Sequence, residues 1–510
     1  MEPINPLVQA DPFSSIAGSD HKEGSSLAIS GQVRANPIIW KLTAIGVALE
    51  ILYAVFLVAP YEFSGLADQP LKSLGDLIRG SSAHTGQLAI ALIAGLLLFY
   101  AGIRIARRDT EGRATGMVIV FGILSSLTLF VLHGAGSTDI FSYAMLGRIL
   151  GHYHANPMFV APKTFASDQL LPYVTWKSRP GLGYGPLWYF LSAIPSALGI
   201  DGIAAQLSAM KCLILAFHIA NCFVIRAILL IARPWTTTLG VLLYAWNPLL
   251  VFEGPGDGHN DIIMIFFVLL ALLLLVRGRK FWVMPVLALS VLIKPLTLAL
   301  SAVFWFHLLR TYPTIPERLK FAMSSVAVTL TVVIVLYIPF WNGRNTLEVQ
   351  HNFQDLAAHS PARLMQLGAQ RLADRLPNQA LVIGAALRSI QLSALVLSGC
   401  LILFLAWRRS GPHVSNLLAA SYLSMFAFML VLWWYHPWYG ISLVTLAAVI
   451  STGDIAAHGL VFTASTLAGL GLILAESGDI YVVPVLWLLP VVYFLKLLWD
   501  RRYWNTTSTQ

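Results

Sequence analysis

One carboxylate stands directly after the apolar run 115–134, within the segment Ser137-Thr138-Asp139-Ile140-Phe141-Ser142-Tyr143. Asp139 is expected where the hydrocarbon meets water, which is the depth at which a lipid-linked phosphate would lie. An acid in that position can act as a general base towards an acceptor hydroxyl. The order Ser-Thr-Asp before an amphipathic helix is also a common helix start, with a side chain of this type as the N-cap. The residues alone leave both interpretations of Asp139 open.

A second group of polar residues fills the stretch 253–261, between two apolar runs. Its glycines permit tight turns with exposed backbone donors, which suits the binding of sugar hydroxyls or of a phosphate. The alternative is a glycine-rich external turn whose last acid caps the next helix. No paired histidine spacing indicates a metal, so we predict none, although these residue types do not exclude a divalent cation. The candidates here are Glu253, Asp257, His259, Asn260 and Asp261.

Two basic residues are candidates for holding an anion. Lys294 stands alone in an apolar run and is followed by Pro295. A lysine at that depth needs a phosphate, an acid such as Glu253, or a path to the interface. Arg148 follows Asp139 on the same segment and can hold a phosphate through its fork of donors. The alternative for Arg148 is a surface charge on an interfacial helix.

Aromatic side chains accompany the polar groups. Tyr143 lies in the first segment, Tyr184 opens a later apolar run, and His436 and Trp438 lie in the aromatic turn 433–439. Flat rings can pack on the C–H faces of sugars and on polyprenyl chains. An aromatic belt at the membrane interface is the alternative.

The overall composition indicates what kind of protein holds these residues. The chain has 510 residues, of which 57% are hydrophobic and only 11% charged, and its mean hydropathy is +0.72. Soluble proteins carry about 25% charged residues, so the chain is predicted to be a polytopic membrane protein. The net charge of +9 is attributed to basic cytoplasmic turns rather than to nucleic-acid binding.

Apolar runs recur from about Trp40 to Trp499 and predict an all-α bundle of about 12 to 14 membrane spans. The run 184–200 contains two prolines and is interpreted as an embedded or half-crossing element. The runs 281–295 and 296–310 meet at Lys294-Pro295 with no polar loop between them. They are predicted to be two short helices that meet inside the membrane, near its outer side.

Basic clusters orient the chain, since lysine and arginine gather on the cytoplasmic side. That orientation places 135–183 and 342–384 outside as two long loops, which is a common location for functional segments. Each long loop shows apolar residues at helical spacing, which predicts a helix along the membrane surface. Shorter outer segments are predicted at 61–84, 253–260 and 434–438.

The segments together resemble a known family, the polyprenol-phosphate-mannose-dependent α-1,6-mannosyltransferases of the GT-C superfamily. They occur in the expected order between about 115 and 452. The matching stretches are Asp139-Ile140-Phe141-Ser142-Tyr143 with Gly147-Arg148, Asn156-Pro157, Tyr184-Gly185-Pro186-Leu187, Trp246-Asn247-Pro248-Leu249 with Gly258-His259-Asn260-Asp261, Lys294-Pro295 and Pro437-Trp438-Tyr439.

The resemblance implies an inverting transfer of a sugar, mannose in the family, from a polyprenyl phosphate to a glycan or glycolipid hydroxyl. Asp139 takes the place of the family's loop acid and would be the general base. Lys294 and Arg148 would hold the donor phosphate. Ile140 and Phe141 follow Asp139, so only one acid of the family's acidic pair is present, and the resemblance does not indicate a metal or another cofactor. The substrate-binding residues would be Tyr143, Tyr184, Glu253, Asp257, His259, Asn260, Asp261, His436 and Trp438.

The expected organisation is a disordered cytoplasmic tail at 1–35, a two-helix addition at 36–114, a GT-C-like catalytic region at 115–499 and a cytoplasmic tail at 500–510. The expected setting is the bacterial plasma membrane, with the active site on the extracytoplasmic face. The expected partners are the lipid donor, the acceptor and membrane lipid, with no nucleic acid. A transporter or flippase of lipid-linked sugars is the main alternative, and a non-catalytic lipid-binding subunit is another.

Overall fold

A computed structural model describes residues 36–60, 82–132, 136–181, 183–348, 357–409, 411 and 413–500. The expected tail at 1–35 lies outside the described residues, as do most of the outer loop 61–84 and of the tail 500–510. The described chain is helical, and its only β-type pairing is an isolated bridge between Ala358 and Trp434.

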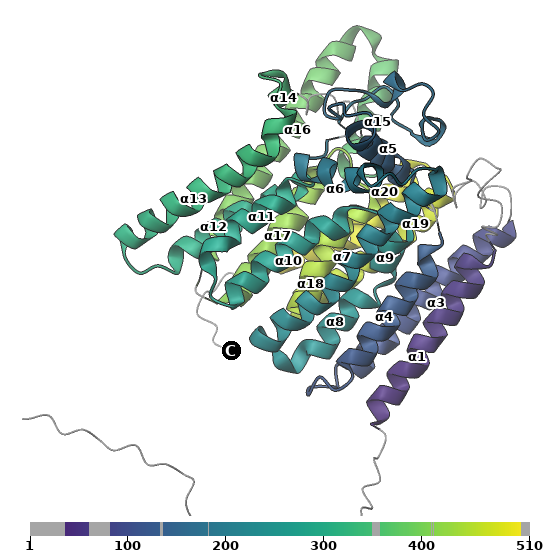
Figure 1. Ribbon diagram of the computed structural model, residues 1–510, viewed down its shortest axis with the longest axis vertical. Coiled ribbons are helices and arrows are strands. Elements are labelled where there is room, and N and C mark those ends of the chain that lie inside the picture. Colours follow the sequence, from purple (N-terminus) through teal and green to yellow (C-terminus); the bar gives the residue numbers. More distant parts are fainter. Residues whose placement is uncertain are drawn as a thin grey trace, which may run out of the picture. The chain divides into compact units, whose positions relative to one another are not determined.

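The helices between residues 37 and 276 include those next to Asp139 and to the stretch 253–261. They are α1 (Pro37–Tyr53), α3 (Ser82–Ala106), α4 (Thr115–Phe130), α5 (Asp139–Gly151), α6 (Pro186–Ala197), α7 (Ile203–Ala232), α8 (Thr237–Ala245), α9 (Pro248–Val251) and α10 (Asp261–Val276). Helices α1, α3 and α4 pack side by side (Figure 1).

The later helices complete the bundle. They are α11 (Val283–Val291), α12 (Leu298–Arg310), α13 (Ile315–Tyr337), α14 (Asn345–Glu348), α15 (Pro361–Arg375), α16 (Ala380–Arg408), α17 (Val414–Val431), α18 (Gly440–Ile450), α19 (Gly453–Leu474) and α20 (Asp479–Trp499). Helix α13 leaves most of its apolar side chains exposed, as expected where a helix faces lipid.

The prediction of a polytopic helical bundle is confirmed. Within the described ranges, 8 helices are long and apolar enough to cross a membrane, or 9 if Pro248–Gly256 and Asp261–Val276 count as one bent span. Shorter apolar helices lie at Thr115–Phe130, Lys280–Val291, Pro295–Arg310 and Pro437–Ile450. The predicted 12 to 14 spans (about 20 residues each) therefore require that the shorter helices also cross.

The proline-containing run 184–200 forms the 12-residue helix α6. At about 1.5 Å per residue this helix is roughly 18 Å long, which is well short of a hydrocarbon core of about 30 Å. It therefore does not cross by itself, as expected for an embedded or half-crossing element. Helix α6 packs along α5 instead.

Helix α5 forms where the sequence predicts a surface helix, but its surroundings differ from that expectation. All residues from Ile140 to Ile149 are buried, whereas a helix lying on a membrane surface buries one face only. Helix α5 packs against α6 and α7. Helices α5 and α6 can approach this closely because Gly147 has no side chain. A β-carbon on Gly147 would collide with the backbone of Ser192 in α6.

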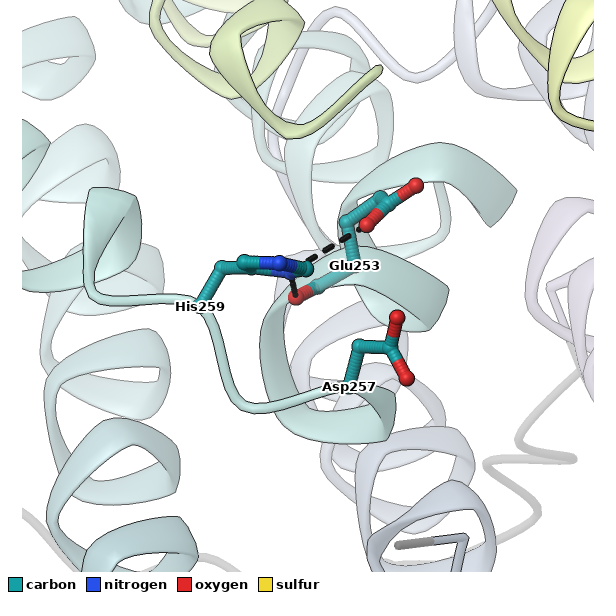
Figure 2. Close-up of side chains that lie close together, drawn as sticks. All are labelled: Glu253, Asp257 and His259. Atoms are coloured by element: carbon teal, nitrogen blue, oxygen red, sulfur yellow. Dashed lines mark hydrogen bonds and ion pairs between the residues drawn. The ribbon is translucent and has the colours of Figure 1, made fainter. Parts of the chain in front are cut away.

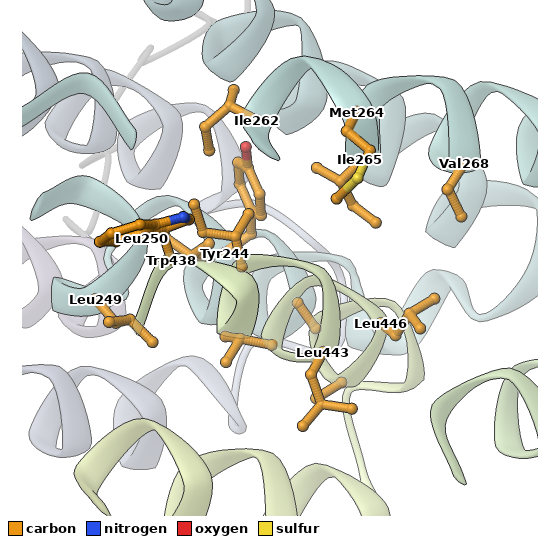
Figure 3. Packing of buried hydrophobic residues seen from close by; sticks show 14 of the residues in the cluster. Tyr244, Leu249, Leu250, Ile262, Met264, Ile265, Val268, Trp438, Leu443 and Leu446 are labelled. Carbon is orange, nitrogen blue, oxygen red and sulfur yellow. The ribbon is translucent and has the colours of Figure 1, made fainter. Parts of the chain in front are cut away.

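The core lies where α10 and α18 meet α8 and α9. Every residue of α18 is buried, and α18 contains no charged residue. Figure 3 shows side chains from these helices packed together, among them Tyr244, Met264, Leu443 and Leu446. An apolar centre of this kind gives the polar loops above it a rigid support.

The chain between α9 and α10 is broken, and the two helical parts meet at an angle of 116°. Pro255 lacks a backbone donor, and Gly258 adopts a φ of +82°, which favours glycine. Polar backbone groups freed inside a membrane protein need partners. The ammonium of Lys211 in α7 supplies one of them, since it donates to the carbonyl of Gly256 at 2.6 Å.

The predicted meeting of two short helices at Lys294-Pro295 is confirmed. Helix α11 ends at Val291, and the turn Pro295–Thr297 leads into α12. Lys294 has an extended backbone, with φ −152° and ψ 128°, because a following proline disfavours the helical conformation. The Lys294 side chain therefore extends from the break between α11 and α12, not from the face of a helix.

Candidate active site

Asp139 is the first residue of α5, and Thr138 is its N-cap without a side-chain capping bond. The backbone N–H of Asp139 donates to Oγ of Ser137 at 3.1 Å. The capping interpretation of the Asp139 carboxylate therefore does not hold. Its side chain is half-buried and lies near the hydroxyl of Tyr143, one turn further along the helix.

The surroundings of Asp139 change its acidity. Burial raises the pKa of the carboxyl above its ordinary value, because water no longer stabilises the charged form. The positive charges of His259 and Lys294 act against this rise, and the Asp261 carboxylate adds to it. A carboxylate with a raised pKa is a stronger base than an exposed aspartate.

Two tyrosines connect Asp139 to the stretch 253–261. The hydroxyl of Tyr143 donates to Oδ1 of Asn260 at 3.4 Å, and the hydroxyl of Tyr184 donates to that of Tyr143, also at 3.4 Å. The rings of Tyr143 and Tyr184 meet edge to face with centroids 5.4 Å apart. Both rings therefore belong to the polar site and not to an outer belt.

Lys294 and Asp261 form a buried ion pair. The Nζ of Lys294 donates to Oδ1 and Oδ2 of Asp261 at 3.1 and 2.9 Å, and Asp261 is fully buried. The ammonium also lies 4.1 Å from the ring centroid of Tyr439, a cation–π distance. Asp261 begins α10 after its N-cap Asn260, so this acid pairs with a lysine and is not the cap.

Glu253, Asp257 and His259 lie together just before α10, all buried (Figure 2). Nδ1 of His259 lies 2.8 Å from the carbonyl oxygen of Glu253 and 3.2 Å from its Oε2. Asp257 accepts the backbone N–H of Gly136, which belongs to the segment entering α5. The two polar segments of the sequence thus share one site.

Three rings are stacked beside this group. His259 lies over Trp438 with centroids 4.1 Å apart, and His436 lies over Trp438 at 4.2 Å. The interplanar angles are 15° and 5°. The face of the Trp438 ring therefore packs on the His259 ring. His436 is part of the same stack and so lies beside the site.

Arg148 is not brought to this site. Its Nε donates to Oδ2 of Asp168 at 2.7 Å, and its Nη1 donates to Oδ1 of Asp201 at 2.6 Å. Asp168 also accepts from the hydroxyl of Tyr153 at 2.8 Å. Arg148 thus joins α5 to the segment after it and to the turn before α7 through two of its nitrogens.

Comparison with known proteins identifies the family. Residues 47–309 match the family described as alpha-(1->6)-mannopyranosyltransferase, N-terminal domain. The chain belongs to this family. It is also 24% identical, over 388 residues, to alpha-(1->6)-mannopyranosyltransferase A of Corynebacterium glutamicum, a match that covers 69% of this chain and 77% of that protein. No solved structure matches the chain.

Membership in the mannopyranosyltransferase family supports mannosyl transfer by a multi-pass membrane protein. The matched range 47–309 contains Asp139, the stretch 253–261 and Lys294. Tyr439 lies at the site but was not among the predicted site residues. A tyrosine in an aromatic turn gives no sign in the sequence of a cation–π contact with Lys294. The ammonium of Lys211 donates to the backbone carbonyls of Phe130 and Gly256, at 2.5 and 2.6 Å.

An apolar groove begins beside the Lys294-Pro295 break of this mannopyranosyltransferase-family chain. It has a volume of about 390 Å³ and runs between α11, α12 and α13. Its lining is Gly183, Gly185, Met284, Ala288, Val291, Leu292, Pro295, Leu298, Ser301, Thr329, Val333 and Tyr337. Tyr184, whose hydroxyl reaches Tyr143, stands between the two glycines that line the groove.

Proposed function

We propose that the protein transfers mannose from a polyprenyl-phosphate donor to a hydroxyl of a glycan or glycolipid acceptor, with inversion at the anomeric carbon. The observation that carries this proposal is the position of Asp139. Its carboxylate lies beside Tyr143 and within the electrostatic reach of His259 and Lys294, and an apolar groove begins next to Lys294.

In this reaction the acceptor oxygen attacks the anomeric carbon of the donor sugar. Asp139 takes the proton of that hydroxyl as the new bond forms, and the raised pKa of its carboxyl favours this step. The bond between the anomeric carbon and the phosphate oxygen breaks, and polyprenyl phosphate leaves from the opposite face. Base and leaving group on opposite faces give inversion, as in other inverting glycosyl chemistry.

Lys294 is the group proposed to hold the donor phosphate. Its ammonium has three donors and lies 2.9 Å from Oδ2 of Asp261. A fixed positive charge at the departing phosphate stabilises the charge that develops there. Arg148 does not support the proposal, since Asp168 and Asp201 occupy its donors.

The groove between α11, α12 and α13 is the proposed place for the polyprenyl chain of the donor. Its lining is largely apolar, and it begins next to Lys294. A chain lying there would place its phosphate end at the lysine. The exposed apolar face of α13 provides a path for the chain from the surrounding lipid.

The extracytoplasmic placement is supported by the two helices that flank the site. Helix α4 follows the basic residues Arg107, Arg108 and Arg113 and is followed by Asp139. Helix α10 begins at Asp261 and is followed by the basic residues Arg277 and Arg279. Basic residues mark cytoplasmic ends, so both helices put the site at the opposite end.

A transporter or flippase is the alternative from another class. Transporters place polar groups near the bilayer midplane, along a path that opens to both sides. Here the residues of α10 after Asp261, Ile262 to Val276, are all apolar. The polar residues gather at one end of α10, which favours a one-sided catalytic site.

The test is transfer of labelled mannose from polyprenyl-phosphate mannose to a mannoside acceptor, in membranes containing the unmutated chain or Asp139→Asn. Loss of a general base is expected to lower the rate by about 10²- to 10⁴-fold, with donor binding retained. Glu111→Gln is the matched control, because Glu111 is an exposed acid before the start of α4, whereas Asp139 follows the end of α4. Undiminished transfer by Asp139→Asn would contradict the assignment and direct attention to the acids of 253–261.

A second outcome concerns the donor. If the unmutated chain transfers another lipid-linked sugar and not mannose, the reaction class stands and the proposed sugar is wrong. If no lipid-linked sugar is transferred to any acceptor while lipid-linked sugar crosses the membrane, the flippase alternative is favoured.

A further inference from the structure

Glu253, Asp257 and His259 direct ligand atoms into one small space. One carboxylate oxygen from each acid and one ring nitrogen of His259 lie within 4.8 Å of one another. Two atoms that bind the same ion at about 2.0 to 2.4 Å are at most about 4.8 Å apart, and the three atoms here meet that limit. Figure 2 shows the three side chains grouped around the turn between η6 (Phe252–Gly256) and α10.

Two buried atoms at this place lack a partner among the described residues. They are Oε1 of Glu253 and Nε2 of His259, whereas Oε2 of Glu253 has only its ion-pair contact with Nδ1 of His259 at 3.2 Å. Glu253 is 1% exposed and His259 is fully buried. A buried polar atom without a partner is costly, and here the two such atoms belong to two side chains that contact each other. That arrangement is expected where a ligand completes the site.

We propose that Glu253, Asp257 and His259 bind one divalent cation. Two carboxylates and an imidazole suit Mn²⁺, Mg²⁺ or Zn²⁺. The ligand side chains also make hydrogen bonds to the protein backbone, and such bonds orient the ligands of a metal. His259 is held by the carbonyl of Glu253 at 2.8 Å, and Asp257 is held by the backbone N–H of Gly136.

Three protein ligands leave coordination positions open for water or for an oxygen of a bound molecule. Asp139 lies within the electrostatic reach of Glu253 and His259, so the charge of the cation would act on the carboxylate assigned as base. The assignment of the cation site does not rest on the proposed transfer, since it predicts binding that is measured without substrate.

The test uses the purified full chain in detergent, with any affinity tag removed and metals stripped by a chelator. Mn²⁺ is added, and the free ion is followed by electron paramagnetic resonance. The expected result is one saturable site per chain. Glu253→Gln and Asp257→Asn are each expected to weaken binding at least tenfold, and the exposed-acid control Glu111→Gln is expected to leave it unchanged.

Thermal unfolding with and without Mn²⁺ keeps the test decisive if a variant is unstable. Mn²⁺ is expected to raise the Tm of the unmutated chain and of Glu111→Gln, but not that of Asp257→Asn. Glu253→Asp retains the charge and is expected to weaken binding less than Glu253→Gln does.

Absence of saturable binding of Mn²⁺, Mg²⁺ and Zn²⁺ to the unmutated chain would overturn the proposal. The protonated His259 would then be the partner of the Glu253 carboxylate. Binding that survives both Glu253→Gln and Asp257→Asn would overturn it as well. Asp139→Asn separates the two proposals, because it is expected to lower the rate of transfer about 10²- to 10⁴-fold and to retain the cation.

Discussion

The backbone N–H of Gly136 donates to both carboxylate oxygens of Asp257, at 2.8 and 3.0 Å. Gly136 precedes Asp139 by three positions, and Asp257 lies 121 positions further along the chain from Gly136. This contact fixes the segment that enters α5 against the turn that precedes α10. Asp257 therefore positions Asp139 through the backbone without touching its carboxylate.

Gly136→Ala tests this positioning. A β-carbon at Gly136 would lie 2.7 Å from Oδ2 of Asp257, so the carboxylate or the segment must move. Because small displacements of a reacting group are costly, kcat is expected to fall roughly 10- to 100-fold. Gly116→Ala in α4 is the matched control, since its β-carbon meets nothing within 4 Å. An unchanged kcat in Gly136→Ala, measured by mannose transfer, would show that the contact does not position the base.

The sequence predicted the features that depend on composition and on neighbouring residues. The high apolar content predicted the helical bundle, and the proline after Lys294 predicted the break between α11 and α12. The short helix α6 followed from its two prolines. Each of these features is set by local backbone chemistry or by hydrophobicity, which can be read along the chain.

The pairing of charges could not be predicted in the same way. Lys294 was expected to meet a phosphate or an acid such as Glu253, and its partner is Asp261, 33 positions earlier. Arg148 follows Asp139 closely in sequence, yet nine residues of helix separate the two by about 13 Å. Its partners Asp168 and Asp201 are brought to it by the packing of α5 and α6, which no spacing rule reveals.

The pH dependence of transfer is expected to report on Asp139. The base must be ionised, and burial raises the pKa of its carboxyl above the ordinary 3.8. The rate is therefore expected to fall as the pH decreases through this raised pKa, with a midpoint above 3.8. The measurement is kcat for mannose transfer across the acidic range. An acid limb that persists unchanged in the residual activity of Asp139→Asn would assign it to another group.

Lys294 and Asp261 are expected to show strong coupling. Lys294→Met leaves the buried Asp261 carboxylate without its cation, which costs about 3–5 kcal/mol of stability, so the Tm is expected to drop. The double variant Lys294→Met/Asp261→Asn removes both charges and is expected to recover most of that Tm. Transfer is expected to stay low in the double variant, because the proposed phosphate contact is still missing. Recovery of transfer together with the Tm would show that Lys294 has only a structural role.

Arg148→Met distinguishes a structural arginine from a phosphate-binding one. Asp168 has a fully buried side chain, so removing the guanidinium leaves a buried carboxylate unpaired and is expected to cost about 3–5 kcal/mol. Asp201 is largely exposed and adds little, because water screens it. The expected result is a lowered Tm with an unchanged KM for the donor in the protein that remains folded. Arg113→Met is the matched control, since Arg113 pairs with Glu111 on an exposed turn. An unchanged Tm combined with a raised donor KM would instead restore Arg148 as a phosphate ligand.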